Sequence, residues 1–272
     1  MKKFTLLNNF ASQNCVFDAF NRVHPVKYRQ RRSSFTGFNR VKKFLNYWRR
    51  QLIDLLFPKT CLGCGRPETW LCSACREKII VEFSFYCPGC QKPRGELGVC
   101  PNCSASYLNG VYLIAPYADK LINRALKAIK YDLAKDLTVE VLGQYLAKYF
   151  SHFQLAGDFL LAPIPLHRRR FLQRGFNQAR LIADLIGQMK NLPITDDLLV
   201  RVKYNQPQAQ LKHQARLENV SGIFRVNNFG LLNKKILLID DVYTTGATMQ
   251  EAAKVLKIAG ATQVYGLAMA RG

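Results

Sequence analysis

The sequence has no long hydrophobic run. No apolar stretch approaches the roughly 18 to 20 residues that a membrane-spanning helix requires, so we expect no integral membrane segment. The first residues resemble the start of a signal peptide, but their apolar stretch stops at Asn8 and is too short for one. We therefore expect a cytoplasmic protein.

Acidic residues are also scarce. The 272-residue chain has 18 Asp and Glu against 40 Lys and Arg, which gives a net charge of +22. A charge of this sign favours phosphate-bearing ligands or a polyanionic partner such as nucleic acid. Residues 1–60 hold half of the excess, with 13 basic side chains against Asp18 and Asp54. Residues 1–37 lack sustained periodicity and are predicted to be a disordered basic tail.

A basic amphipathic helix is predicted at residues 38–57, and Pro58 ends it. Its apolar positions recur at helical spacing and are Phe38, Val41, Leu45, Trp48, Leu52 and Leu55. Such a helix can lie on DNA, on the inner face of the membrane or against its own protein, and the sequence leaves these alternatives open.

Eight of the nine cysteines form four Cys-x-x-Cys pairs within residues 58–107. The pairs are Cys61/Cys64, Cys72/Cys75, Cys87/Cys90 and Cys100/Cys103. Two such pairs present four thiolates to one Zn²⁺, so the spacing predicts a double zinc ribbon with two structural zinc ions. A disulfide framework is disfavoured in a cytosolic chain. Pairing of consecutive knuckles keeps the connections short and is favoured, while a cross-braced arrangement stays open.

From residue 108 to residue 272, apolar strands alternate with helices. We expect strands near residues 111–117, 158–163, 236–240 and 263–269, and helices near residues 119–131, 136–152, 176–189 and 246–259. This alternation is typical of an α/β fold with a mostly parallel, twisted sheet and helices on its faces.

The strand predicted at residues 236–240 looks buried on both faces and leads into two acids. A small polar loop and a helix follow, through Val242, Tyr243, Thr244, Thr245, Gly246, Ala247 and Thr248. A helix N-terminus favours a phosphate through its unpaired N–H groups and its dipole, and Gly246 lets the backbone approach closely. Carboxylates at the end of such a strand, here Asp240 and Asp241, can accept hydrogen bonds from two neighbouring ribose hydroxyls.

A second basic segment follows the strand predicted at residues 158–163. Residues 162–170 and 173–178 place four arginines in a turn, an arrangement suited to a pyrophosphate.

Residues 235–248 resemble the phosphoribosyl pyrophosphate (PRPP) signature of type I phosphoribosyltransferases, with an apolar strand, Asp-Asp and a Thr-Thr-Gly-x-Thr loop. Together with residues 56–64, 127–132 and 162–178, they are similar to the ComF (ComFC) family, in which a zinc ribbon precedes a phosphoribosyltransferase domain. The resemblance covers roughly residues 50–272, with the motifs in the family's order.

The resemblance implies that Asp240 and Asp241 are the catalytic pair that holds the ribose hydroxyls, and that residues 244–248 bind the 5′-phosphate. It also implies a mobile loop over the site at residues 201–219. The residues assigned on this basis to the pyrophosphate and to the loop are Pro165, Leu166, His167, Arg168, Arg169, Arg174, Arg201, Gln210 and Arg216.

In function, the resemblance implies Mg²⁺-assisted phosphoribosyl transfer and a part in natural competence. The partners expected on this basis are PRPP, single-stranded DNA taken up by the cell, and proteins of the competence machinery. No residue pattern singles out a purine, a pyrimidine, ammonia or a nucleic-acid base as the acceptor. The alternative is a non-catalytic DNA-binding adaptor whose PRPP site is a sensor or a relic.

Overall fold

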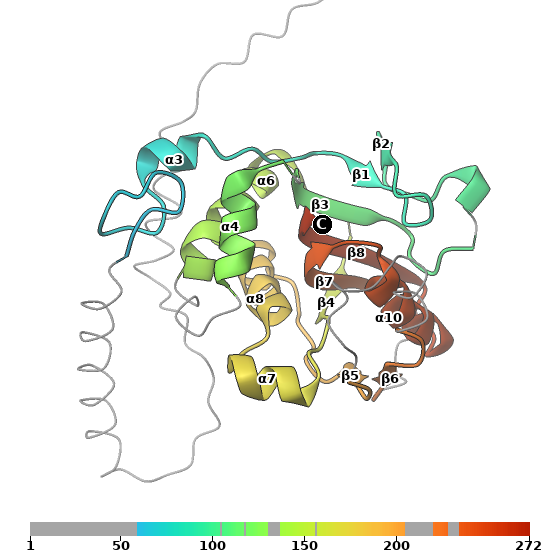
Figure 1. Cartoon of the computed structure of the whole chain (residues 1–272). Helices are drawn as coiled ribbons and strands as arrows, with labels where there is room; N and C mark the ends of the chain where they lie inside the picture. Colours follow the sequence, from blue (N-terminus) through green and yellow to red (C-terminus); the bar gives the residue numbers. More distant parts are fainter. Residues whose placement is uncertain are drawn as a thin grey trace, which may run out of the picture. The chain divides into compact units, whose positions relative to one another are not determined.

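A six-stranded sheet in the order β2-β1-β3-β8-β7-β4 lies at the centre of the described chain (Figure 1). Its strands are β1 (Phe85–Tyr86), β2 (Pro93–Arg94), β3 (Val111–Ala115), β4 (Phe159–Pro163), β7 (Lys235–Tyr243) and β8 (Gln263–Arg271). The four strands β3, β8, β7 and β4 are parallel, and β1 and β2 extend the sheet beyond β3 in antiparallel pairing.

The computed structural model describes residues 59–103, 105–116, 118–129, 137–155, 157–204, 220–227 and 234–272. All of them belong to one unit, Pro58–Gly272. The basic tail predicted at residues 1–37 and the helix predicted at residues 38–57 lie outside the described residues. So does most of the loop predicted at residues 201–219.

Strand β7 is buried on both of its faces, as its apolar sequence predicts. Successive side chains of a strand point to opposite faces, so Ile236 and Leu238 pack in one core cluster while Leu237 and Ile239 pack in the other. All four side chains are fully buried. Parallel strands with helices on both faces require such a continuous apolar run.

Helices cover both faces of this sheet. The cluster with Leu237 takes in α4 (Lys120–Ala128), the π-helical turn η3 (Thr138–Leu142), α6 (Gly143–His152) and α8 (Gln178–Lys190). The cluster with Leu238 takes in α10 (Ala247–Ile258) and the short antiparallel pair β5 (Leu199–Arg201) and β6 (Phe224–Val226). None of the helices in the described ranges has both the length and the apolar character needed to span a membrane.

The predicted α/β fold with a mostly parallel sheet is confirmed, and each of the four expected strands is present with bounds shifted by a few residues. Several short elements were not predicted. They are α3 (Ser73–Glu77), η1 (Pro101–Cys103), α7 (Arg168–Arg174) and the strands β1, β2, β5 and β6. A strand of two or three residues is too short to display a periodicity, and the sheet that orders it is formed by distant parts of the chain.

We predict that Leu238→Ala lowers the free energy of unfolding by about 3 kcal/mol, because Leu238 is fully buried at the centre of β7 and truncation leaves a cavity. Leu172→Ala is the matched control, since Leu172 is 71% exposed on α7 and its truncation removes little packing. Urea denaturation of the two variants measures both effects. Equal losses of stability would contradict the central position of β7.

Candidate functional site

The eight ligand cysteines form two clusters of four, and each cluster uses two consecutive knuckles. The first ribbon is defined by Cys61, Cys64, Cys72 and Cys75, and the second ribbon by Cys87, Cys90, Cys100 and Cys103. Within each cluster the sulfur atoms lie within 4.8 Å of one another. The predicted consecutive pairing is therefore confirmed.

The spacing of the sulfur atoms fits a tetrahedral metal. Zn–S bonds of about 2.3 Å place the four sulfurs of a tetrahedron about 3.8 Å apart. The Cys64 and Cys72 sulfurs are separated by 3.6 Å in the first ribbon, and the Cys87 and Cys100 sulfurs by 3.4 Å in the second. The two clusters thus fit two structural zinc sites, as the sequence predicts.

In each ribbon, a backbone N–H donates a hydrogen bond to the sulfur of the ribbon's first cysteine. The backbone N–H of Cys72 donates to Cys61 Sγ at 3.4 Å, and that of Cys100 donates to Cys87 Sγ at 3.5 Å. Burial raises the pKa of both thiols, but backbone N–H groups more than offset it and lower the pKa of Cys61 and of Cys87 to about 6. Both sulfurs therefore favour the thiolate form that zinc binds.

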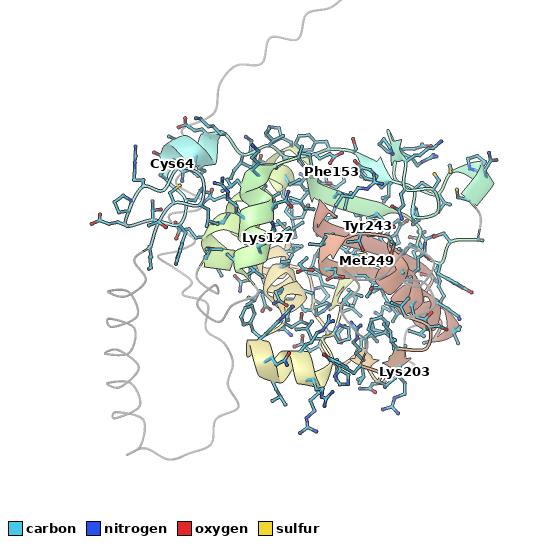
Figure 2. All side chains as sticks on the ribbon, in the orientation of Figure 1. Cys64, Lys127, Phe153, Lys203, Tyr243 and Met249 are labelled. Atoms are coloured by element: carbon cyan, nitrogen blue, oxygen red, sulfur yellow. The ribbon has the colours of Figure 1, made fainter. Side chains whose placement is uncertain are left out.

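A cavity of about 210 Å³ lies at the carboxyl ends of β4 and β7. Such crevices are the usual ligand sites of open α/β sheets. Its walls are formed by Ile164, Pro165, Leu166, Arg170, Arg174, Asn177, Gln178, Ala179, Arg201, Asp240, Asp241, Val242, Tyr243, Thr244, Gly246, Thr248 and Met249. Tyr243 and Met249 are labelled in Figure 2, where β7 leads into α10.

Two acids from the end of β7 enter this cavity side by side. The backbone N–H of Asp241 donates to Asp240 Oδ1 at 2.9 Å. Burial and then the neighbouring charge of Asp241 raise the pKa of Asp240 well above its ordinary value, although Arg201 opposes the shift. Two carboxylates this close destabilise the ligand-free protein, and they favour the binding of hydroxyl groups, which donate hydrogen bonds to them, or of a cation.

Three arginines line the same cavity as the acids. Arg170 and Arg174 are four residues apart on α7, so they share one face of that helix, and Arg201 ends β5. Burial lowers the pKa of Arg174 and of Arg201, while the charges of Asp241 and Asp240 respectively raise them. With three guanidinium groups against two carboxylates, the cavity is suited to an anion such as a phosphate.

Three residues of the cavity wall carry a buried polar atom without a partner among the described residues. Gln178 Nε2, Arg201 Nε and the Tyr243 hydroxyl have no hydrogen-bond partner in the part of the chain that the structure describes. Gln178 is only 2% exposed. Because buried donors and acceptors in proteins are normally paired, these three atoms are costly for the ligand-free protein.

The threonine loop, residues 244–248, follows β7 directly and continues into the first turn of α10. Gly246 has φ of 75° and a Cβ there would lie 2.3 Å from the Tyr243 hydroxyl, so both backbone conformation and space require glycine. Gly246 is the N-cap of α10 and supplies no side-chain cap for the first turn. The loop thus presents the N-terminus of a twelve-residue helix toward the cavity, an arrangement that favours an anion.

Most of the predicted site residues come together in this cavity. From the strand and loop it includes Asp240, Asp241, Val242, Tyr243, Thr244, Gly246 and Thr248, and from the other segments Pro165, Leu166, Arg174 and Arg201. Thr245 and Ala247 are in the loop but not in the cavity wall, and His167, Arg168 and Arg169 are also outside it. Gln210 and Arg216 lie outside the described residues.

His167 has a local role at the start of α7. One of its ring nitrogens accepts from the backbone N–H of Arg169 at 3.2 Å, and its ring contacts that of Tyr204 edge-on with centroids 5.1 Å apart. The guanidinium of Arg169 lies 5.3 Å from the centre of the same Tyr204 ring. His167 and Arg169 thus contact Tyr204, and neither of them is part of the cavity wall.

Arg170, Asn177 and Gln178 also line the cavity. All three lie in the basic segment predicted to suit a pyrophosphate, where Arg170 is one of the four arginines, but none of them was assigned individually to the site. The four-residue spacing of Arg170 and Arg174 places both side chains on one face only if the segment is a helix, and α7 was not predicted. Asn177 caps α8 by accepting from the backbone N–H of Ala179, and it donates to the Ile164 carbonyl at 3.0 Å. It therefore joins the two segments that form one wall of the cavity.

Two family models match the chain and define its class. A double zinc ribbon domain matches residues 52–106, and a phosphoribosyl transferase domain matches residues 172–269. The cysteine clusters lie in the first match, and the acids with the threonine loop lie in the second. The chain thus carries, in this order, a region that matches a double zinc ribbon domain and a region that matches a phosphoribosyl transferase domain.

Curated proteins of similar sequence are named for competence or for DNA utilization. Competence protein ComFC of Bacillus subtilis is 29% identical over an alignment of 204 residues, and the match covers 70% of this chain and 79% of the relative. Competence protein F of Haemophilus influenzae is 28% identical over 224 residues, covering 73% and 96%. DNA utilization protein YhgH of Escherichia coli is 26% identical over 221 residues, covering 77% and 96%. The predicted relationship to the ComF (ComFC) family is confirmed by these matches.

We predict that metal analysis of the purified chain gives two zinc ions per chain, one for each cysteine cluster. Replacement of Cys87 and Cys90 by serine removes two of the four ligands of the second ribbon and should lower the content to about one. Inductively coupled plasma mass spectrometry measures both values. A content of one or none in the unaltered chain would contradict the two-site assignment.

Asp240→Asn should stabilise the ligand-free protein at neutral pH. Because burial raises the pKa of Asp240, its ionisation favours the unfolded state once the pH exceeds the ordinary carboxyl pKa of about 4, and asparagine has no such cost. We expect a higher melting temperature for the variant at pH 7 and a smaller difference at pH 4. Asp158→Asn, at an exposed position, is the control. A lower melting temperature for Asp240→Asn at pH 7 would contradict the raised pKa that we assign to Asp240.

Proposed function

We propose that the chain binds PRPP with Mg²⁺ and transfers the phosphoribosyl group to an acceptor nucleophile with release of pyrophosphate. The observation that supports this most directly is one cavity that combines paired acids, a helix N-terminus after a threonine loop, and three arginines. These groups match the ribose, the 5′-phosphate and the pyrophosphate of PRPP respectively. The phosphoribosyl transferase domain match over residues 172–269 supports the same class of ligand.

In the proposed binding mode, the ribose hydroxyls donate to Asp240 and Asp241. The 5′-phosphate lies at the threonine loop, where backbone N–H groups and threonine hydroxyls donate to it. The pyrophosphate lies against residues 164–166, with Arg170 and Arg174 on the neighbouring face of α7. This mode places hydroxyl donors beside the acids and an anion beside the arginines that line the cavity.

The chemistry breaks the bond between the anomeric carbon and the pyrophosphate oxygen, and the acceptor forms the new bond to that carbon. Negative charge grows on the departing pyrophosphate, and the arginines of α7 stabilise it. Positive charge grows on the ribose, close to the carboxylates of Asp240 and Asp241. Mg²⁺, held mainly by substrate oxygens with few protein ligands, would neutralise further charge on the pyrophosphate.

Isothermal titration of PRPP in the presence of Mg²⁺ tests this proposal. We expect the double change Asp240→Asn with Asp241→Asn to abolish measurable PRPP binding, because both acceptors for the ribose hydroxyls lose their charge. Asp158→Asn is the control for loss of a carboxylate, since Asp158 is exposed and outside the cavity wall. Unchanged PRPP affinity in the double variant would contradict the proposed site. Transfer itself is tested separately, by a screen of acceptors for pyrophosphate release by the unaltered chain.

We further propose that the chain acts on single-stranded DNA in natural transformation, together with proteins of the competence machinery. The relatives' names, Competence protein ComFC and DNA utilization protein YhgH, support this role, as does the net charge of +22. In this proposal residues 1–37 and 38–57, predicted from the sequence to be a basic tail and a basic helix, contact the DNA. Residues 58–107 and 108–272 form the ribbon and transferase domains.

Binding to a single-stranded oligonucleotide should weaken steeply as salt is raised, because contacts to phosphates release counterions. Deletion of residues 1–50 should reduce the slope of log affinity against log salt concentration. Fluorescence anisotropy of a labelled oligonucleotide measures both slopes. Binding that does not depend on salt would contradict a direct role on DNA. Transformation that survives Asp240→Asn with Asp241→Asn would favour the non-catalytic adaptor.

A further inference from the structure

The second ribbon reaches the threonine loop through one side chain. Gln91 follows the ligand Cys90, and its Nε2 donates to the backbone carbonyl oxygen of Thr245 at 2.8 Å. The two residues are 154 positions apart in the sequence. A residue of the zinc knuckle is thus hydrogen-bonded to the loop that the proposed function assigns to the 5′-phosphate.

This hydrogen bond fixes the orientation of a peptide group. In a planar trans peptide, the carbonyl oxygen and the N–H point in opposite directions. Since Gln91 holds the Thr245 carbonyl on the ribbon side, the N–H of Gly246 points away from the ribbon. Gly246 lines the cavity and Thr245 does not, in agreement with that orientation. Gly246, with φ of 75°, has no side chain that restricts rotation of this peptide group. The hydrogen bond from Gln91 therefore has a large influence on the orientation of the peptide.

The amide of Gln91 is itself held in one orientation. Its Oε1 accepts from Arg271 Nη2 at 3.4 Å, and arginine can only donate. Its Nε2 must therefore be the atom that faces the Thr245 carbonyl, which can only accept. The backbone N–H of Gln91 donates to the Cys87 carbonyl at 2.8 Å, and Gln91 adopts a left-handed φ of 58°. These contacts make the position of Gln91 depend on the knuckle between Cys87 and Cys90.

A second glutamine joins the same ribbon to α10. Gln250 Nε2 donates to Ser106 Oγ at 2.8 Å and to the Pro88 carbonyl at 3.4 Å, and Gln250 Oε1 accepts from the backbone N–H of Tyr107 at 3.1 Å. Pro88 belongs to the knuckle, and strands β1 and β2 on either side of the knuckle are part of the central sheet. Both the loop and the helix that follows it are therefore attached to the second ribbon.

The first ribbon makes its contacts elsewhere. Thr69 Oγ1 donates to Glu140 Oε1 at 3.0 Å, and Arg124 Nη1 donates to the Leu62 carbonyl at 2.8 Å. Glu140 and Arg124 belong to η3 and α4, and neither lines the cavity. The two zinc ribbons thus have similar metal sites, but these contacts of the first ribbon are with residues outside the cavity wall, whereas the second ribbon is hydrogen-bonded to the threonine loop.

We propose that Gln91 is a positioning residue for 5′-phosphate binding, and that the second ribbon is a structural part of the substrate site. The inference rests on the proposed function, because it takes residues 244–248 as the 5′-phosphate site. Gln91 does not touch the ligand. It acts through the Thr245–Gly246 peptide, which presents the Gly246 N–H to the phosphate.

Gln91→Met tests this inference, since methionine is close in size but can neither donate to the Thr245 carbonyl nor accept from Arg271 as Gln91 does. Isothermal titration with ribose 5-phosphate, with PRPP and with inorganic pyrophosphate, each with Mg²⁺, separates the two ends of the site. We expect affinity for ribose 5-phosphate and PRPP to fall on the order of fivefold, the effect of one hydrogen bond. Affinity for pyrophosphate should not change, because pyrophosphate binds on the α7 side. Zinc content should stay at two per chain.

Thr69→Val is the matched control, because it removes one hydrogen bond between the first ribbon and the α/β domain without a change of shape. It should leave affinity for all three ligands unchanged. Equal affinity of Gln91→Met and the unaltered chain for ribose 5-phosphate would overturn the positioning role and leave the proposed function standing. An equal loss for pyrophosphate would overturn it too, since that result marks a general structural defect. An unaltered chain that binds neither PRPP nor ribose 5-phosphate would overturn the proposed function and this inference together.

Discussion

The parallel pairing of β7 between β4 and β8 is the constraint on which the rest of the structure depends. The register pairs Leu238 with Ala162 of β4 and with Gly266 of β8, so the three strands run side by side. Both faces of β7 are covered by apolar side chains, and its direction then places Asp240 and Asp241 at the edge where β4 also ends. The acids, the threonine loop and the segment after β4 meet because these strands are parallel neighbours.

The cavity at this edge joins groups that are unfavourable when they are buried alone. Asp240 is desolvated beside Asp241, and Arg201 is desolvated with a pKa below its ordinary value. Opposite charges offset part of this cost, and the unpaired polar atoms of Gln178 and Tyr243 add to it. Such arrangements are typical of functional sites, where the groups are matched to a ligand rather than to one another.

The sequence alone predicted the elements whose signals are local. The four zinc knuckles follow from cysteine spacing, and the order of strand, acids, threonine loop and helix follows from residues 235–259. Consecutive pairing of the knuckles was favoured but not decided, because either pairing satisfies the same spacing. Short elements such as α7 were missed, and with them the alignment of Arg170 with Arg174. Seven residues give too little periodicity to distinguish a helix from a turn.

The sequence by itself determined which chemical groups the protein carries: eight thiolate ligands, two acids after an apolar strand, and a glycine where the backbone is left-handed. It did so because metal coordination and backbone conformation depend on residues close together in the chain. Only the tertiary structure decided that Arg201 faces Asp240 and that Gln91 of the second ribbon holds the Thr245 carbonyl. Those contacts join residues far apart in sequence, and the packing of the sheet, which no local pattern encodes, is what brings them together.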